Sequence, residues 1–169
     1  MLKWPLIVLA VIALLVAGIA IIGMFLPVGH QSARTVNVNA PPESVFALIT
    51  DVERYSTWRR DVKEVTLLAD SPGVIRFREV GRNGTVTYRV VDQEPPVRWV
   101  VRIDDPSLPY GGTWTYSLRP EGSGTSLTIT EDGEVYNPIF RFLSRTVFST
   151  AATIEAYQAA LRARLDGGA

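Results

Sequence analysis

The sequence contains no cysteine, and His30 is the single histidine among its 169 residues. The absence of cysteine excludes disulfides, thiolate metal sites and cysteine nucleophiles. One histidine cannot form a multi-histidine metal site, and His30 precedes the elements predicted below, which also argues against a histidine-dependent triad. We therefore expect neither a metal nor another cofactor.

Net charge is absent as well, because 17 basic and 17 acidic residues are spread along the chain. Nucleic-acid-binding proteins usually carry a basic stripe or patch, and no stretch of this sequence has one. We expect no nucleic acid among the partners. The length is sufficient for one domain with a substantial core.

The N-terminal region contains a long apolar run, which extends from Leu6 to Leu26 without a charged residue. This run is long enough to cross a hydrocarbon core of about 30 Å. A cleaved signal peptide is the alternative, but its apolar part usually has about 7–15 residues and precedes a small-x-small cleavage site, which is missing here. We predict a single-pass anchor over residues 1–27 that crosses the membrane with residues 5–26, then a linker over 28–34 and a domain over 35–166. The small excess of positive charge before the run favours an extracytoplasmic domain.

The tail of the chain, residues 137–165, has the pattern of one long amphipathic helix. Asn137 is a favoured N-cap residue, and Pro138 suits the first helical position, where its missing N–H group needs no partner. Apolar side chains then recur every three or four residues and share one face, whereas Arg141 falls on the opposite, polar side. The apolar face consists of Ile139, Leu143, Val147, Ala151, Ile154, Tyr157, Leu161 and Leu165. Because no later helix is predicted, this face must pack on the strands that precede it.

Between the apolar run and this helix, turn residues separate seven runs that are rich in β-branched and aromatic side chains. Two short helices, predicted over residues 43–50 and 51–58, follow the first run. Short connections between consecutive runs favour antiparallel pairing. We therefore predict an α+β fold in which a curved antiparallel sheet of about seven strands wraps around the long C-terminal helix. The runs cover residues 35–39, 62–69, 74–80, 85–93, 97–103, 113–118 and 126–135.

Short motifs in this region resemble those of one family. They are Pro42-Glu-Ser-Val-Phe46, Asp51-Val, Tyr55-Ser-Thr-Trp58, Pro96-Val-Arg-Trp99, Gly112-Thr-Trp-Thr-Tyr116, Gly124-Thr and Thr130-Glu131. From about Thr35 to Leu165 the chain resembles the polyketide cyclase/dehydrase branch of the START-like (SRPBCC) superfamily. The resemblance implies a helix-grip fold with a cavity between the curved sheet and the long helix. It implies little about function, since the superfamily includes enzymes, lipid carriers and receptors.

Alternation along the strands predicts which side chains face the helix. These side chains are mostly apolar or aromatic, and small helix residues lie opposite them. Such an arrangement either fills a core or lines a pocket for an apolar ligand, and the resemblance favours the pocket. The expected partner is a hydrophobic small molecule such as a lipid, an isoprenoid or a polyketide. The predicted ligand-binding residues are Phe77, Tyr88, Trp99, Trp114, Tyr116, Ala151 and Ile154.

Glu79 and Glu131 are the candidates for proton transfer, because both fall on the inward face of their strands. A carboxyl group in an apolar pocket has a raised pKa, which suits acid–base chemistry near neutral pH. Tyr88 or Tyr116 could hydrogen-bond an enolate oxygen. Glu79, Glu131 and Tyr88 therefore form a candidate catalytic set for a cyclase or dehydratase, a lyase or isomerase that needs no metal. The alternative is that both glutamates lie in water or pair with an arginine, for which Arg54, Arg59 and Arg76 are the candidates.

Three functions follow from these patterns. The first is a membrane-anchored module that binds a hydrophobic small molecule, and the second is the cyclase or dehydratase. The third is a protein-interaction module at the membrane, for which a filled core and a contiguous exposed apolar patch would be the signs. The volume and lining of the space between the sheet and the long helix distinguish these functions, because they show whether that space is a pocket or a packed core.

Overall fold

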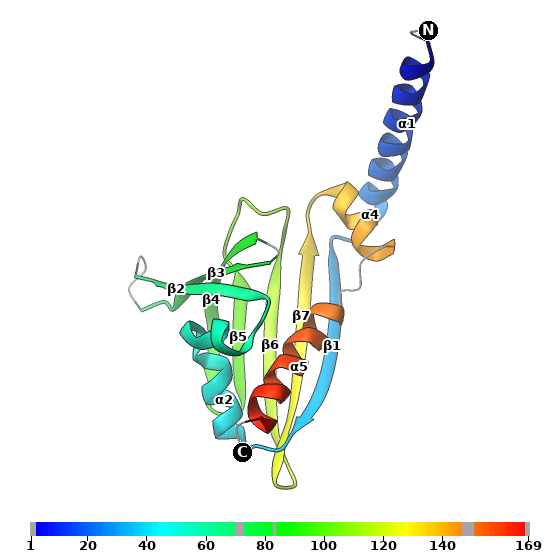
Figure 1. The fold of residues 1–169 in the computed structure, drawn as a ribbon. Helices are drawn as coiled ribbons and strands as arrows, with labels where there is room; N and C mark the ends of the chain where they lie inside the picture. The colour runs from blue at the N-terminus through cyan, green and yellow to red at the C-terminus, as the bar shows by residue number, and fades with distance from the viewer. Residues whose placement is uncertain (1–2, 70–72, 83, 147–150, 168–169) are drawn as a thin grey trace.

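A computed structural model of the chain describes residues 3–69, 73–82, 84–146 and 151–167. A seven-stranded antiparallel sheet curves around the helix α5 (Ala151–Asp166), and the apolar helix α1 (Lys3–Phe25) projects from one end of the domain (Figure 1). The α+β helix-grip architecture predicted from the sequence is confirmed. The strands are β1 (Gly29–Val38), β2 (Val62–Leu68), β3 (Arg76–Gly81), β4 (Gly84–Glu94), β5 (Arg98–Ile103), β6 (Tyr110–Glu121) and β7 (Gly124–Val135).

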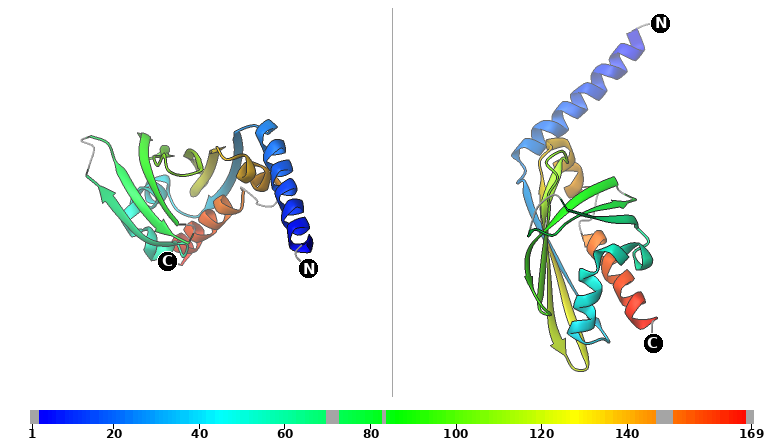
Figure 2. Two further views of the ribbon diagram at one scale, coloured as in Figure 1. Left: turned by 90° about the horizontal axis from the view of Figure 1, so that it is seen from above. Right: turned by 90° about the vertical axis from the view of Figure 1, so that its left-hand side faces the viewer.

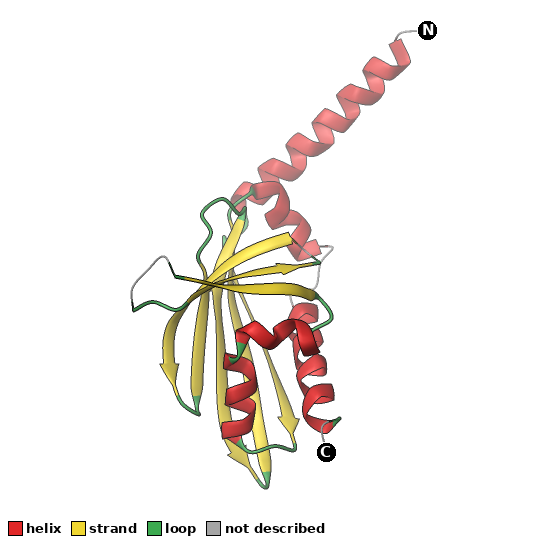
Figure 3. Ribbon diagram, turned by 60° about the vertical axis from the view of Figure 1, so that its left-hand side comes forward, coloured by secondary structure: helices red, strands yellow, loops and turns green. Residues whose placement is uncertain are grey.

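The sheet has the order β1-β7-β6-β5-β4-β3-β2, so β2 to β7 form a continuous meander and β1 pairs with the last strand. The helices α2 (Pro42–Thr50) and α3 (Tyr55–Trp58), with the 3-10 turn η1 (Val52–Arg54) between them, lie with α5 on the concave side (Figures 2 and 3). The concave face is therefore the only sheet face that helices of the described part of the chain cover, and it holds the core.

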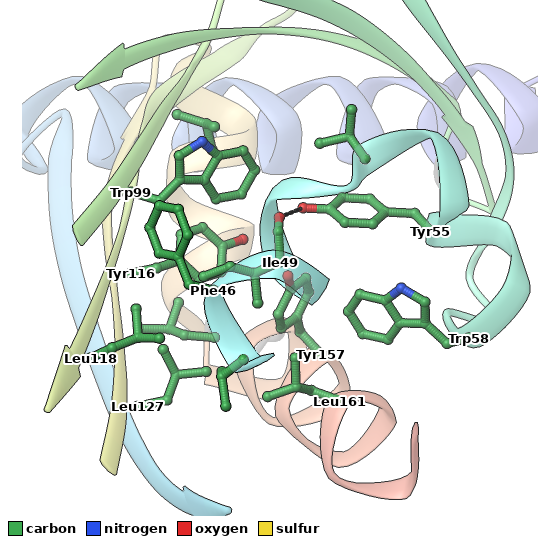
Figure 4. Close-up of a cluster of buried hydrophobic side chains, with 14 of the residues drawn as sticks. Phe46, Ile49, Tyr55, Trp58, Trp99, Tyr116, Leu118, Leu127, Tyr157 and Leu161 are labelled. Atoms are coloured by element: carbon green, nitrogen blue, oxygen red, sulfur yellow. Dashed lines mark hydrogen bonds between the residues drawn. The ribbon is translucent and has the colours of Figure 1, made fainter. Parts of the chain in front are cut away.

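Aromatic side chains dominate this core (Figure 4). The ring of Tyr157 on α5 lies 5.4 Å from the ring of Trp58 and 5.4 Å from that of Tyr116, measured between centroids. The hydroxyl of Tyr55 donates a 2.6 Å hydrogen bond to the carbonyl oxygen of Ile49, which satisfies a polar group that would otherwise be buried at a cost. Strand alternation correctly predicts the buried inward residues Phe77, Trp99, Val101, Tyr116, Leu118, Leu127 and Ile129.

The first strand begins at Gly29, so residues 29–34, which the sequence suggested to be a linker, are part of the sheet. His30 therefore lies within the fold, opposite Gly133 of β7, and not outside it. This half of β1 has no apolar alternation because it is an edge strand. Its pairing with β7 is made by the backbone, with a 2.6 Å hydrogen bond from Gln31 Nε2 to Asp132 Oδ1 beside it.

The C-terminal segment forms two described helices, α4 (Pro138–Thr146) and α5, instead of the single helix predicted. The two helices pack on different partners, because α4 contacts α1 and α5 contacts β1. Arg141, expected on a solvent-facing side, is buried against α1. Of the small residues expected opposite the strands, Ala151 is buried and Ala152 is exposed. Four residues of the predicted helix, 147–150, lie outside the described residues.

Candidate functional site

The concave face is unevenly filled along its strands. Tyr116, Leu127 and Ile129 are almost completely buried. One inward position further toward α4, Trp114 and Glu131 form a cross-strand pair and are only half-buried. The pair Tyr88 and Ile103 on β4 and β5 shows the same partial exposure. We call the surface formed by Tyr88, Ile103, Trp114 and Glu131 the half-open face.

Glu131 has the most unusual environment on the half-open face. Its Oε2 atom is buried and has no hydrogen-bond partner among the described residues. Burial raises the pKa of Glu131 to about 7. A carboxyl group with this pKa exchanges its proton readily near neutral pH, as a general acid or base must. The same group, when protonated, can donate a hydrogen bond to a ligand oxygen.

The second predicted carboxylate, Glu79, is bound to Arg59 and so follows the paired alternative raised by its sequence. Burial raises the pKa of Glu79, although the charge of Arg59 opposes the rise. Arg59 also donates a 2.6 Å hydrogen bond to Asp61. A carboxylate with a bound guanidinium is poorly placed to move protons, because its lone pairs are already engaged. The geometry thus separates the two glutamates: Glu79 is paired with Arg59, whereas Oε2 of Glu131 has no hydrogen-bond partner among the described residues.

The charges of both carboxylates, Glu79 and Glu131, act on the hydroxyl of Tyr88. Its ring stacks on Phe77 with centroids 5.2 Å apart. Burial raises the pKa of Tyr88, and the neighbouring charge of Glu79 adds to the rise. The hydroxyl therefore stays protonated across the physiological range and can donate a hydrogen bond to a ligand.

A separate hollow of about 260 Å³ opens beneath the end of α2 and η1. Its volume is just below the range of about 300–1,000 Å³ that is usual for small-molecule pockets. The hollow lies toward β2 to β5 and not under α5, and Trp99 is the only predicted ligand-binding residue in its lining. The lining consists of Thr50, Asp51, Val52, Glu53, Leu67, Ile75, Val90, Gln93 and Trp99.

The structure divides the predicted ligand-binding residues into two groups. Tyr88 and Trp114 are half-buried on the half-open face. The others are buried in the core, namely Phe77, Trp99, Tyr116, Ala151 and Ile154. Strand alternation placed Ile103, which completes the half-open face, on the inward side, but the residue was not among the predicted ligand-binding residues. Within the described residues, no group of three or more His, Asp or Glu side chains is arranged to hold a metal.

The sequence of residues 30–166 matches a protein family described as polyketide cyclase/dehydrase and lipid transport. The chain belongs to this family. The match includes the whole sheet except Gly29, together with α4 and α5. It also includes His30, in agreement with the position of that residue inside β1. No curated protein matches the sequence significantly.

Solved structures have the same fold. The protein TTHA0849 from Thermus thermophilus is 23% identical, with a TM-score of 0.66, and the match covers 83% of this chain and 99% of that one. The Zhui aromatase/cyclase from Streptomyces sp. R1128 is 18% identical, with a TM-score of 0.66 and coverage of 82% and 94%. A START superfamily protein from Mycobacterium smegmatis is 20% identical, with a TM-score of 0.65 and coverage of 83% and 99%. At these identities the likeness establishes the fold and leaves the function to the site.

Proposed function

We propose that this protein is a membrane-anchored START-like domain that binds a hydrophobic small molecule on the half-open face. The observation that carries the proposal is the contrast along β6 and β7. Tyr116 and Ile129 are sealed beneath α5, whereas Trp114 and Glu131, the next inward pair, keep part of their surface exposed. Partly exposed aromatic side chains on the concave side of a sheet offer a surface to which an apolar small molecule can bind.

The chemistry of the half-open face indicates what kind of ligand fits. Tyr88, Ile103 and Trp114 offer apolar and aromatic surface, and Glu131 and the Tyr88 hydroxyl offer two polar groups. A mostly apolar molecule with one or two oxygen atoms, such as a lipid, an isoprenoid or a polyketide, would satisfy both kinds of surface. The family to which the chain belongs is described by lipid transport as well as by cyclisation.

The anchor in this proposal is α1, within residues 1–27. Trp4–Phe25 has the length and composition of a membrane-spanning helix or of a signal sequence, and nearly all of its surface is exposed. An uncovered apolar helix of this length needs a lipid environment. An anchored domain meets membrane-dissolved ligands at a high effective concentration. We further propose that residues 35–166 face the extracytoplasmic side, as the charge before α1 favours.

The test is the identity of what the full chain carries after purification. The protein is reconstituted in nanodiscs of one synthetic phosphatidylcholine, extracted with organic solvent and analysed by mass spectrometry. We expect an apolar species other than the supplied phospholipid. Ile103→Trp, which fills the half-open face, should lose it. Thr115→Trp on the opposite face of the sheet is the matched control and should retain it. No species from the wild type, or equal retention by Ile103→Trp, would contradict the proposal.

The unpartnered Oε2 atom of Glu131 supports a second function, a cyclase or dehydratase that needs no metal. Its pKa of about 7 suits it to remove a proton next to a carbonyl group and return it to a leaving hydroxyl. Tyr88 would hydrogen-bond the enolate oxygen, whereas Glu79 would hold Arg59 in place. With a β-polyketone substrate, Glu131→Gln should abolish turnover and retain binding, and Glu121→Gln at the tip of the β6–β7 hairpin should change neither.

A further inference from the structure

The helix α4 packs against the C-terminal part of α1. Exposure is reduced from Gly18 to Ala20 and at Gly23 of α1, and at Leu26 just after the helix. The spacing of Ile19, Gly23 and Leu26 places them on one side. Gly23 is the closest point, because a Cβ atom at this position would overlap the backbone carbonyl oxygen of Pro138. The end of α1 and the start of α4 are therefore in backbone contact.

Arg141 on α4 fixes this contact. Its guanidinium donates to the carbonyl oxygens of Gly23 at 3.2 Å and Leu26 at 3.1 Å, at the C-terminal end of α1. It also donates to Val135 and Tyr136, both at 2.9 Å, at the end of β7. The last carbonyl groups of a helix lack partners within it, and a positive charge there favours the helix dipole. Arg141 thus joins α1, α4 and the sheet while almost completely buried.

The geometry determines how deep α4 lies if α1 spans a bilayer. The 22 residues of Trp4–Phe25 measure about 33 Å at about 1.5 Å per residue, which barely exceeds a hydrocarbon core of about 30 Å. The span therefore needs nearly all of α1, including the last two turns, against which α4 packs. A helix bound to that part of α1 lies at the level of the lipid head groups and the outermost hydrocarbon of the same leaflet.

The exposed side chains around this joint suit that depth. Phe25, Phe140 and Tyr136 leave 86%, 52% and 47% of their surfaces uncovered by the protein. Aromatic side chains are enriched at membrane–water interfaces. Arg145 on α4 donates to the carbonyl oxygens of Pro27 and Gly29, both at 3.0 Å, and remains exposed at the level of the head groups. Long basic side chains in this position keep their charge among polar groups.

We propose that α4 is an interfacial helix. It inserts Phe140 into the leaflet that contains the C-terminal end of α1, and it holds the adjoining end of the domain against the lipid surface. This inference rests on the proposed anchor. The bilayer is the occupant because α1, to which α4 is fixed, crosses it. The sheet and α5 extend away from this end of the molecule (Figure 1). Trp114 and Glu131 lie toward α4 along their strands, so the half-open face is placed on the membrane side of the domain.

Nitroxide labels test the proposal in the full chain, whose lack of cysteine allows single labels at chosen positions. Ile12→Cys reports on the middle of α1, Phe140→Cys on α4, and Glu121→Cys on the far hairpin, and all three side chains are exposed. In vesicles of phosphatidylcholine and phosphatidylglycerol, power saturation compares access to oxygen, which dissolves in lipid, with access to a water-soluble nickel complex. We expect the oxygen-to-nickel ratio at position 140 to exceed that at position 121 severalfold.

The label at position 12 separates the two ways in which the proposal can fail. If position 12 is in lipid but position 140 has the ratio of position 121, α4 stands in water; the interfacial role is then overturned while the anchor remains. If position 12 itself has a water-like ratio, the anchor is wrong and the interfacial helix with it. Lipid access at positions 12 and 140, with water access at 121, supports both.

Discussion

Arg59 donates two hydrogen bonds to the carboxylate of Glu79, at 2.8 Å and 3.2 Å. Both side chains are nearly covered, with 11% and 13% of their surfaces exposed. The guanidinium also lies 5.0 Å from the ring centroid of Tyr55 and 5.1 Å from that of Tyr157. One buried cation thus joins β3 to the short helices and to α5. Removal of one partner from such a pair leaves an uncompensated buried charge.

Arg59→Met should lower the free energy of unfolding by about 3–5 kcal/mol, since Glu79 loses its counter-ion in a largely buried site. The double variant Arg59→Met, Glu79→Leu should regain most of this loss. Denaturant unfolding of the detergent-solubilised chain, followed by tryptophan fluorescence, measures the difference. The matched control is the exposed pair of Arg98 and Asp92, in which Arg98→Met should cost no more than about 1 kcal/mol. If the double variant is as unstable as the single one, the loss reflects the ring contacts of Arg59 and not its charge.

Glu131 should make the protein less stable as the pH rises. Its folded pKa of about 7 exceeds the ordinary value of 4.5, so the folded state binds the proton more tightly than the unfolded state. The wild type then keeps its full stability below pH 4.5 and loses it as the pH rises through 7. Glu131→Gln should melt at the wild-type temperature at pH 4.5 and several degrees higher at pH 8. After allowance for solvent screening, this difference corresponds to about 1–2 kcal/mol. A pH-independent difference would contradict the raised pKa.

The sequence was sufficient to predict the sheet and the direction of its side chains, because a strand has a period of two and turn residues punctuate the chain. Trp114 and Glu131 were therefore correctly placed on the inward face. Their partial exposure was not predictable, since it depends on where α5 lies along the strands. The sequence also left open whether Glu79 pairs with an arginine. The ion pair with Arg59 depends on how the end of α3 packs against β3, which no local pattern predicts.

Arg141 illustrates a different limit. Helical periodicity placed it on the polar face of a long helix, and solvent is the usual environment of such a face. The structure buries Arg141 because α1, more than a hundred residues earlier, presents free carbonyl groups at that point. Periodicity within a short stretch of sequence cannot predict a contact between residues so far apart in the chain. The same cause explains why one predicted helix is two, since α4 packs on α1 and leaves α5 to cover the sheet.

Ile154 should carry much of the attachment of α5 to the sheet, because it is completely buried in the core. Ile154→Ala should lower the free energy of unfolding by about 2–5 kcal/mol, through lost apolar burial and the cavity left behind. The adjacent Thr153 is exposed, and Thr153→Ala should change stability by no more than about 0.5 kcal/mol. Thermal unfolding monitored by near-ultraviolet circular dichroism measures both. Equal effects at the two positions would show that α5 does not pack on the sheet through the face that contains Ile154.

Gly23 should be required for the fixed angle between α1 and the domain. Alanine at position 23 would overlap the carbonyl oxygen of Pro138, whereas alanine at position 18 meets nothing within 4 Å. Either replacement raises intrinsic helix propensity by about 1 kcal/mol, so neither weakens α1 itself. The pair therefore isolates the contact with α4. Spin labels at positions 12 and 121 of the same chain allow double electron–electron resonance to measure the distance between helix and hairpin.

For the wild type and Gly18→Ala we expect one narrow distance distribution, and for Gly23→Ala a broad or displaced one. Arg141→Ala should broaden it too, because the carbonyl groups at the end of α1 lose their donor while backbone packing at Gly23 is retained. If Gly23→Ala leaves the distribution narrow and unshifted, α1 is not positioned by α4. The anchor would then be a flexible tether, and the domain would be free to turn its half-open face away from the membrane.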